Sequence, residues 1–170
     1  KLMGVRATIV MPVTTPEIKV ASVRARGAKV VLFGDTFNDA LSHALALEKQ
    51  RNLHFIHPFD DPEIIAGQGT VAMEIIHQHS AKIDAVFVPV GGGGLIAGIA
   101  AYIKTVRPET QVIGVEYEES ASLAAAMAAG RRVKLKQVGI FADGIAVAQV
   151  GKHTWPLMKQ YVDGVITVSS

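Results

Sequence analysis

The 170-residue sequence contains no cysteine and has few charged residues. The absence of cysteine excludes disulfide bonds and thiolate metal sites, and it is compatible with a reducing compartment, so we expect a cytoplasmic protein. Asp, Glu, Lys and Arg make up only 19% of the chain, whereas an average soluble domain carries about 25%. Polar surface is therefore scarce, and we expect either a homo-oligomer or a piece of a larger protein.

Basic residues are not concentrated anywhere in the chain. The net charge is +2, and the arginines at positions 24, 26, 131 and 132 form only short pairs without aromatic residues between them. Nucleic-acid-binding surfaces usually combine a basic patch with a recognisable motif. The sequence therefore predicts solvated arginines and no nucleic-acid partner.

Only one stretch is apolar enough to resemble a membrane span. Residues 83–103 contain a single charge, Asp84, but Pro89 and four consecutive glycines divide them into two short runs. A spanning helix needs roughly 20 continuous apolar residues. We therefore expect a buried strand, a tight loop and a helix here, and no membrane partner.

Strand and helix patterns alternate along the chain. Such alternation predicts parallel strands, and continuous apolar strands such as 85–90 are typical of sheets covered on both faces. The expected class is α/β, with parallel sheets and helices on both faces. Strands are expected at 6–11, 29–33, 53–56, 85–90, 111–116 and 165–168, and helices at 15–26, 37–51, 68–78, 95–105, 122–129 and 154–161.

The two ends of the sequence read as interruptions of structural elements. Residues 1–4 resemble the end of a helix with no cap before it, and the chain stops at Ser169 and Ser170, just after an expected strand. We therefore expect a chain that is truncated at both ends.

Four consecutive glycines, Gly91 to Gly94, join the apolar strand at 85–90 to the helix that follows. Glycines allow a sharp turn and a close approach of the backbone to a ligand. The free N–H groups and the dipole at the start of a helix favour a phosphate. The loop therefore predicts a phosphate site, and the alternative is that it only permits a tight turn.

The loop also fits a dinucleotide-binding pattern. Gly92, Gly94 and Ala97 match G-x-G-x-x-G/A, and Glu116 lies 24 residues after Gly92 at the end of an expected strand. An acid near that position binds a ribose hydroxyl in dinucleotide folds. From the residues alone, this alternative stays open.

Four segments of the sequence are informative together: residues 16–27, I-A-G-Q-G-T at 65–70, G-G-G-G-L at 91–95 and F-A-D-G-I-A-V at 141–147. They resemble a helix, a second motif, the phosphate loop and a further motif of fold-type II pyridoxal-phosphate (PLP) enzymes, especially threonine dehydratases and serine racemases. Y-V-D-G-V-I-T-V at 161–168 favours biosynthetic threonine dehydratase. The order and spacing match over nearly the whole chain.

The resemblance implies a PLP-dependent ammonia-lyase of isoleucine biosynthesis, which converts L-threonine, with serine as an alternative substrate, into a 2-oxo acid and ammonia. Residues 1–57 would be part of the smaller α/β domain and residues 58–170 part of the larger, cofactor-binding one. The alternatives are a serine racemase or serine dehydratase-like PLP enzyme, and a phosphate- or dinucleotide-binding module without catalysis.

The resemblance also assigns individual residues. Gly91, Gly92, Gly93, Gly94 and Leu95 would cradle the PLP phosphate, and Gly144 would lie against the cofactor, whereas from the residues alone it would be a turn glycine. The Schiff-base lysine of the family lies in an S-F-K-x-R-G-like motif that does not occur in this sequence. No catalytic residue is therefore assigned, and we expect the 170 residues alone to be inactive.

Part of the family has a cation site formed by a strand-end acid, a backbone carbonyl and a second acid. Glu116 and the Ser120 carbonyl correspond to the first two positions, but Ser122 at the third lacks a carboxylate. Hard cations prefer several oxygen ligands. The alternative for Glu116 is an ordinary solvated or helix-pairing acid.

Overall fold

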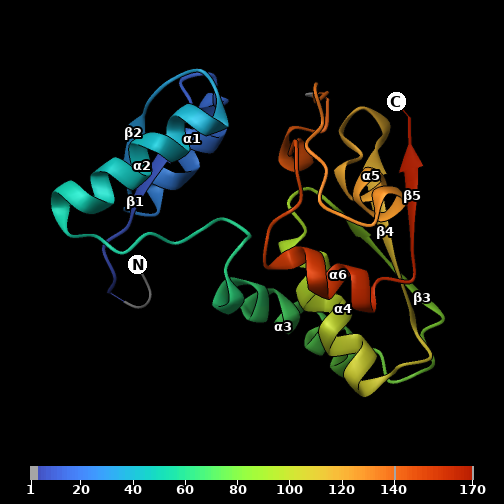
Figure 1. Ribbon diagram of the computed structural model, residues 1–170. Coiled ribbons are helices and arrows are strands. Elements are labelled where there is room, and N and C mark those ends of the chain that lie inside the picture. Colours follow the sequence, from blue (N-terminus) through green and yellow to red (C-terminus); the bar gives the residue numbers. More distant parts are fainter. Residues whose placement is uncertain (1–3, 140, 170) are drawn as a thin grey trace. The chain divides into compact units, whose positions relative to one another are not determined.

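The computed structural model describes residues 4–139 and 141–169. The chain forms two compact units, Lys1–Phe55 and Ile56–Ser170, which we describe separately (Figure 1). The expected helix end at residues 1–4 falls, apart from Gly4, outside the described residues, as does Ser170.

The first unit is a two-stranded parallel sheet with two helices. Thr8 pairs with Lys29 and Met11 with Leu32, which confirms the expected parallel pairing. The elements are β1 (Thr8–Met11), α1 (Glu17–Ala25), β2 (Lys29–Leu32) and α2 (Phe37–Arg51).

Helix α2 begins with a capping box formed by Thr36 and Asp39. The Thr36 hydroxyl accepts a hydrogen bond from the Asp39 amide at 3.2 Å, and the Asp39 carboxylate accepts one from the Thr36 amide at 3.0 Å. The two residues thereby satisfy groups that a helix start otherwise leaves unpaired.

The strand expected at 53–56 does not form. The Leu53 amide donates to the Glu48 carbonyl at 3.0 Å, and the Phe55 amide donates to a carboxylate oxygen of Glu48 at 3.1 Å. These amides are bonded back to helix α2, so they are not available to a sheet. The apolar side chains at 53–56 predict a strand, but a strand also needs a neighbouring strand to accept its backbone hydrogen bonds.

The second unit contains a three-stranded sheet in the order β3-β4-β5, with both pairs parallel. Its elements are α3 (Pro62–Gln78), β3 (Ala85–Pro89), α4 (Gly94–Val106), β4 (Gln111–Tyr117), α5 (Ser122–Ala129), α6 (Thr154–Tyr161) and β5 (Gly164–Val168), with short 3₁₀ helices η1 (Glu118–Ser120) and η2 (Asp143–Ile145). The α/β class with parallel sheets is confirmed.

Helix α3 begins at Pro62, six residues before the expected start. The Asp61 carboxylate accepts hydrogen bonds from the amides of Glu63 at 2.8 Å and Ile64 at 3.2 Å. An aspartate at the N-cap followed by proline at the first helical position is a strong start signal. Gly67 and Gly69 therefore lie inside α3 and not at its start.

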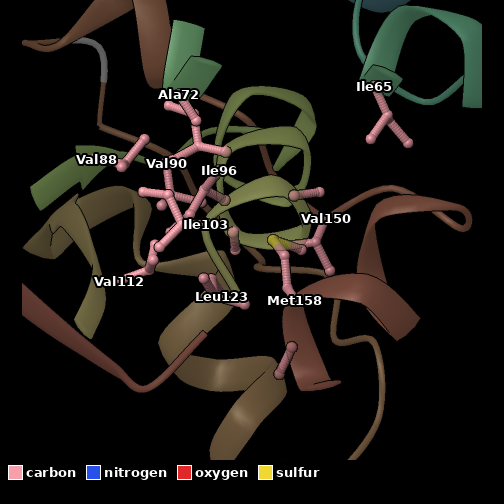
Figure 2. Packing of buried hydrophobic residues seen from close by; sticks show 14 residues of the cluster. Ile65, Ala72, Val88, Val90, Ile96, Ile103, Val112, Leu123, Val150 and Met158 are labelled. Atoms are coloured by element: carbon pink, nitrogen blue, oxygen red, sulfur yellow. The ribbon is translucent and has the colours of Figure 1, made fainter. Parts of the chain in front are cut away.

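One face of the second sheet carries the core. Gly114 in β4 faces α4 and α5, because a Cβ added there would lie 3.3 Å from Ile96 and 3.4 Å from Leu123. Figure 2 shows the buried cluster around these helices. Its members include Val88, Val90, Ile96, Ile103, Val112, Leu123, Val150 and Met158.

The opposite face of this sheet is open to solvent in the described residues. Phe87 pairs with Ile113, and Ile166 pairs with Val115, so these side chains share the face that points away from the core. Phe87 is 61% exposed and Ile166 is 44% exposed.

Helices α3 and α4 cross at two glycines. A Cβ added to Gly98 would meet the Ile65 carbonyl oxygen and would lie 2.6 Å from the Gly69 amide nitrogen. A Cβ added to Gly69 would lie 3.2 Å from the Gly98 carbonyl oxygen. The two backbones are therefore in direct contact. Among the described residues, no helix is long and apolar enough to cross a membrane.

Candidate functional site

The glycine loop lies at the carboxyl end of β3, where α/β folds usually bind ligands. The Val90 amide donates to the Val115 carbonyl at 2.9 Å, which extends the pairing of β3 with β4 by one bond. Gly93 is the N-cap of α4 and has a φ of 93°, in the left-handed region that favours glycine. The chain thus turns from strand to helix within four residues.

The amides of this loop are free to bind a ligand. Within residues 4–139 and 141–169, the N–H groups of Gly91 to Leu95 donate to no protein acceptor. Helix α4 has no acidic residue in its first turn and no side-chain cap at Gly93. The positive end of a 13-residue helix dipole therefore meets a row of unpaired donors, an arrangement that suits an anion.

Packing also requires the glycines of the loop. An added Cβ would lie 3.1 Å from the Ile145 backbone at Gly91 and 2.5 Å from the Met158 sulfur at Gly93. At Gly92 it would overlap the Phe59 ring, and at Gly94 it would lie 2.9 Å from the Phe59 carbonyl oxygen. Glycine at these positions is thus explained without a ligand, and the case for an anion depends on the unpaired amides.

The structure brings the segment around Gly144 next to the loop. Gly144 lies in η2, and the backbone of its neighbour Ile145 packs against Gly91. A Cβ added to Gly144 would meet no described atom within 4 Å. A methyl group at this position would therefore enter open space beside the loop.

Two residues that sequence reasoning missed also belong to this region. The Thr154 hydroxyl donates to the Gly92 carbonyl at 2.8 Å, and the Asp60 carboxylate accepts hydrogen bonds from the amides of residues 152–154. Neither residue belongs to a motif of the sequence. Asp60 directly precedes the Asp61-Pro62 start of α3, and this position was the only signal available.

Glu116 lies at the end of β4 but its side chain points into the core. It is fully buried, and its two carboxylate oxygens accept hydrogen bonds from the amides of Leu123 and Ala124, each at 2.8 Å. Burial raises the pKa of Glu116 and outweighs the backbone hydrogen bonds, which lower it. Glu116 thus caps the start of helix α5. Of the two alternatives to a cation ligand, the structure excludes a solvated acid and agrees with an acid that pairs with a helix.

The residues of the expected cation site do not fit a cation well. Both Glu116 oxygens are already bonded to amides, and Ser120 offers a carbonyl and a buried hydroxyl. The buried Ser122 hydroxyl has no hydrogen-bond partner among the described residues, but it is neutral. No group of three or more His, Asp or Glu side chains in the described part of the chain could hold a metal ion.

Comparisons with known proteins agree with these observations. The model of the family described as pyridoxal-phosphate dependent enzyme matches residues 1–170. The chain is 56% identical to a biosynthetic L-threonine dehydratase of Burkholderia multivorans, over 99% of this chain and 34% of that protein. It is 53% identical to the chloroplastic biosynthetic threonine dehydratase of Arabidopsis thaliana, over 98% of this chain and 28% of that protein. The chain thus spans about a third of the length of these relatives.

Solved structures share the fold. The processed form of threonine deaminase isoform 2 from Solanum lycopersicum superposes with a TM-score of 0.90 at 51% identity, covering 96% of this chain and 48% of that one. Maize serine racemase superposes with a TM-score of 0.93 at 32% identity, covering 99% of this chain and 50% of that one. With a family match over its whole length, the chain belongs to the family of pyridoxal-phosphate dependent enzymes.

Proposed function

We propose that this chain is the part of a biosynthetic threonine dehydratase that binds the phosphate of PLP. The parent enzyme would convert L-threonine into 2-oxobutanoate and ammonia for isoleucine biosynthesis, in the cytoplasm. The observation that supports this most directly is the row of unpaired amides from Gly91 to Leu95 at the start of α4. Identities of 49–56% to threonine dehydratases support threonine as the substrate in this proposal.

Each part of the site has a distinct role in this proposal. The amides of Gly91, Gly92, Gly93, Gly94 and Leu95 hold the phosphate, and the dipole of α4 stabilises its negative charge. The backbone at Gly144 lies against the cofactor, where a side chain would take up its space. When bound, PLP supplies the electron sink for the reaction. Residues 1–57 would belong to the smaller domain of the parent and residues 58–170 to the larger, cofactor-binding one.

Two alternatives keep the same loop. A serine racemase or serine dehydratase-like enzyme would bind PLP identically, and the overlay on maize serine racemase supports that fold, but at only 32% identity. A dinucleotide-binding module would need Glu116 at the ribose. Because the Glu116 carboxylate is buried and bonded to α5, it is not available for that role.

The phosphate site can be tested by titrating the 170-residue chain with pyridoxine 5′-phosphate. This probe has the phosphate of PLP but no aldehyde, so it cannot condense with surface lysines. We expect saturable binding that shifts the amide resonances of Gly91 to Leu95, and no comparable binding of unphosphorylated pyridoxine or NAD. Gly144→Ala should weaken binding by about tenfold or more, the cost of roughly one lost close contact, without changing the melting temperature.

The matched control is Gly67→Ala, because an added Cβ there also meets no described atom but lies in α3, outside the site. This variant should bind the probe as the unaltered chain does. Equal binding of pyridoxine and its phosphate would contradict the proposal. So would release of 2-oxobutanoate from threonine by the pure 170-residue chain, because the proposal assigns it no catalytic residue.

We also propose that the open face of the second sheet is covered in the native protein, by another copy of the chain or by the rest of the parent. Phe87 and Ile166 form an apolar surface there, and β3 and β5 are edge strands that can pair further. In light scattering, we expect the isolated chain to be larger than a monomer and Phe87→Glu to reduce its mass. A concentration-independent monomer would contradict this.

A further inference from the structure

The carbonyl group of Gly92 accepts hydrogen bonds from two donors, one just before α6 and one in its first residue. The Thr154 hydroxyl donates to it at 2.8 Å and the Gly151 amide at 3.0 Å. Thr154 and Gly151 are both buried, so solvent does not compete for these bonds. Because a trans peptide unit is planar, fixing the Gly92 carbonyl also fixes the Gly93 N–H, which points in the opposite direction. The Gly93 amide is thereby directed away from residues 151–154.

The donors are held in turn by Asp60. Its carboxylate accepts hydrogen bonds from the amides of Lys152 and His153, each at 2.7 Å, and from the Thr154 amide at 3.3 Å. Partial burial would raise the pKa of Asp60, but these three backbone bonds and the electrostatic effect of His153 together outweigh it and lower the pKa. Asp60 therefore carries a negative charge at neutral pH and anchors the start of α6.

The turn that contains Asp60 also contacts the loop. The Phe59 ring lies where a Gly92 side chain would be, and the Phe59 carbonyl oxygen lies beside Gly94. The His57 ring nitrogen Nδ1 accepts hydrogen bonds from the amides of Phe59 at 3.2 Å and Asp60 at 2.8 Å. The glycine loop is thus held by the 57–60 turn and by the start of α6, and Asp60 joins these two supports.

We propose that Asp60 and Thr154 are positioning residues, which hold the Gly92 peptide so that the loop amides face the phosphate. This inference rests on the proposed function. Asp60 does not bind the phosphate itself, because two negative charges repel each other. It acts through residues 152–154, and Thr154 acts through the Gly92 carbonyl.

The test compares Thr154→Val with Thr154→Ser in the 170-residue chain. Valine removes the hydroxyl that holds the Gly92 carbonyl, whereas serine keeps it. We expect Thr154→Val to weaken binding of pyridoxine 5′-phosphate about tenfold and to move the Gly93 amide resonance in the free chain. Thr154→Ser should restore both. Inorganic phosphate, as a second probe, should show the same order of affinities.

Thr110→Val is the matched control for a merely structural role. Thr110 is also buried, and its hydroxyl donates to the Ile83 carbonyl at 2.8 Å, at the start of β4 and far along the sheet from the loop. We expect this variant to lose stability without losing affinity for the probe. Affinity that falls equally in Thr110→Val and Thr154→Val would overturn the inference.

The outcomes separate the inference from the proposed function. If the unaltered chain does not bind pyridoxine 5′-phosphate, the proposed function fails. If the unaltered chain binds and folded Thr154→Val binds equally well, only the positioning role fails. Should Thr154→Val not fold, Asp60→Asn decides, because it keeps one acceptor oxygen and loses the charge. A several-fold weaker affinity supports the inference, and an unchanged affinity overturns it.

Discussion

Replacing Gly98 with valine is expected to destabilise the second unit by at least about 3 kcal/mol, because overpacking costs roughly 1–3 kcal/mol even where neighbours can move. Here the added Cβ would meet the Ile65 carbonyl oxygen and the Gly69 amide nitrogen, which belong to the backbone of α3. Backbone atoms cannot move aside as a flexible side chain can, so α3 and α4 would have to separate. Urea denaturation followed by circular dichroism measures the loss.

The same helix pair offers graded controls. Gly69→Ala places its Cβ 3.2 Å from the Gly98 carbonyl oxygen, so it should cost less than Gly98→Ala. Gly67→Ala meets no described atom and lies inside α3. This variant should have a free energy of unfolding about 0.5–1 kcal/mol higher than that of the unaltered chain, because alanine is the better helix former. A Gly98→Val variant as stable as Gly67→Ala would contradict the close crossing of the two helices.

The second large effect is expected at Glu116. Glu116→Ala should lower the free energy of unfolding by roughly 1–3 kcal/mol, because the amides of Leu123 and Ala124 lose their acceptor in a buried position. Helix α5 has no other side-chain cap in the described residues. The measurement is again urea denaturation, with loss of helical signal.

The variant Glu116→Gln separates the effect of the charge of this side chain on stability from the effect of its shape, because glutamine has nearly the same shape but does not ionise. Burial raises the pKa of Glu116 above its ordinary value, so the folded chain binds the proton more tightly than the unfolded chain does. The contribution of this proton binding to the free energy of unfolding is fully present at pH values below the pKa of Glu116 in the unfolded chain. It is lost as the pH rises through the pKa of Glu116 in the folded chain. The free energy of unfolding of Glu116→Gln, compared with that of the unaltered chain, should therefore increase as the pH rises from 4 to 8. A stability difference that does not change with pH would contradict a raised pKa.

Local signals in the sequence were sufficient for much of the fold. The Thr36–Asp39 capping box depends on residues three apart, and α6 runs from Thr154 to Tyr161, the range expected from the sequence. Alternating strands and helices required parallel pairing, and both sheets have it. The glycine loop was placed correctly between β3 and α4 for the same reason, because its turn is determined by neighbouring residues.

Features that depend on distant partners could not be predicted. Residues 53–56 have the composition of a strand, but their amides bond to Glu48. The position of Glu116 at a strand end suggested a ligand-binding acid, whereas the fold directs it to the amides of α5. Asp60 is one of two adjacent acids in a turn. Its neighbour Asp61 is marked as the cap of α3 by the proline that follows it, but no local pattern indicates that Asp60 holds the start of α6.

The hydrogen bonds that hold the Gly92 peptide have a consequence for the order in which parts of the chain fold during synthesis. Thr154 bonds to Gly92 across 62 positions of the chain, and Asp60 bonds to residues 152–154 across 92 to 94. A nascent chain that ends before residue 151 contains the whole glycine motif but lacks the donors at 151 and 154 that hold the Gly92 carbonyl. Closing such long loops is slow compared with forming a helix. The anion site should thus mature late in synthesis, after α4 itself has formed.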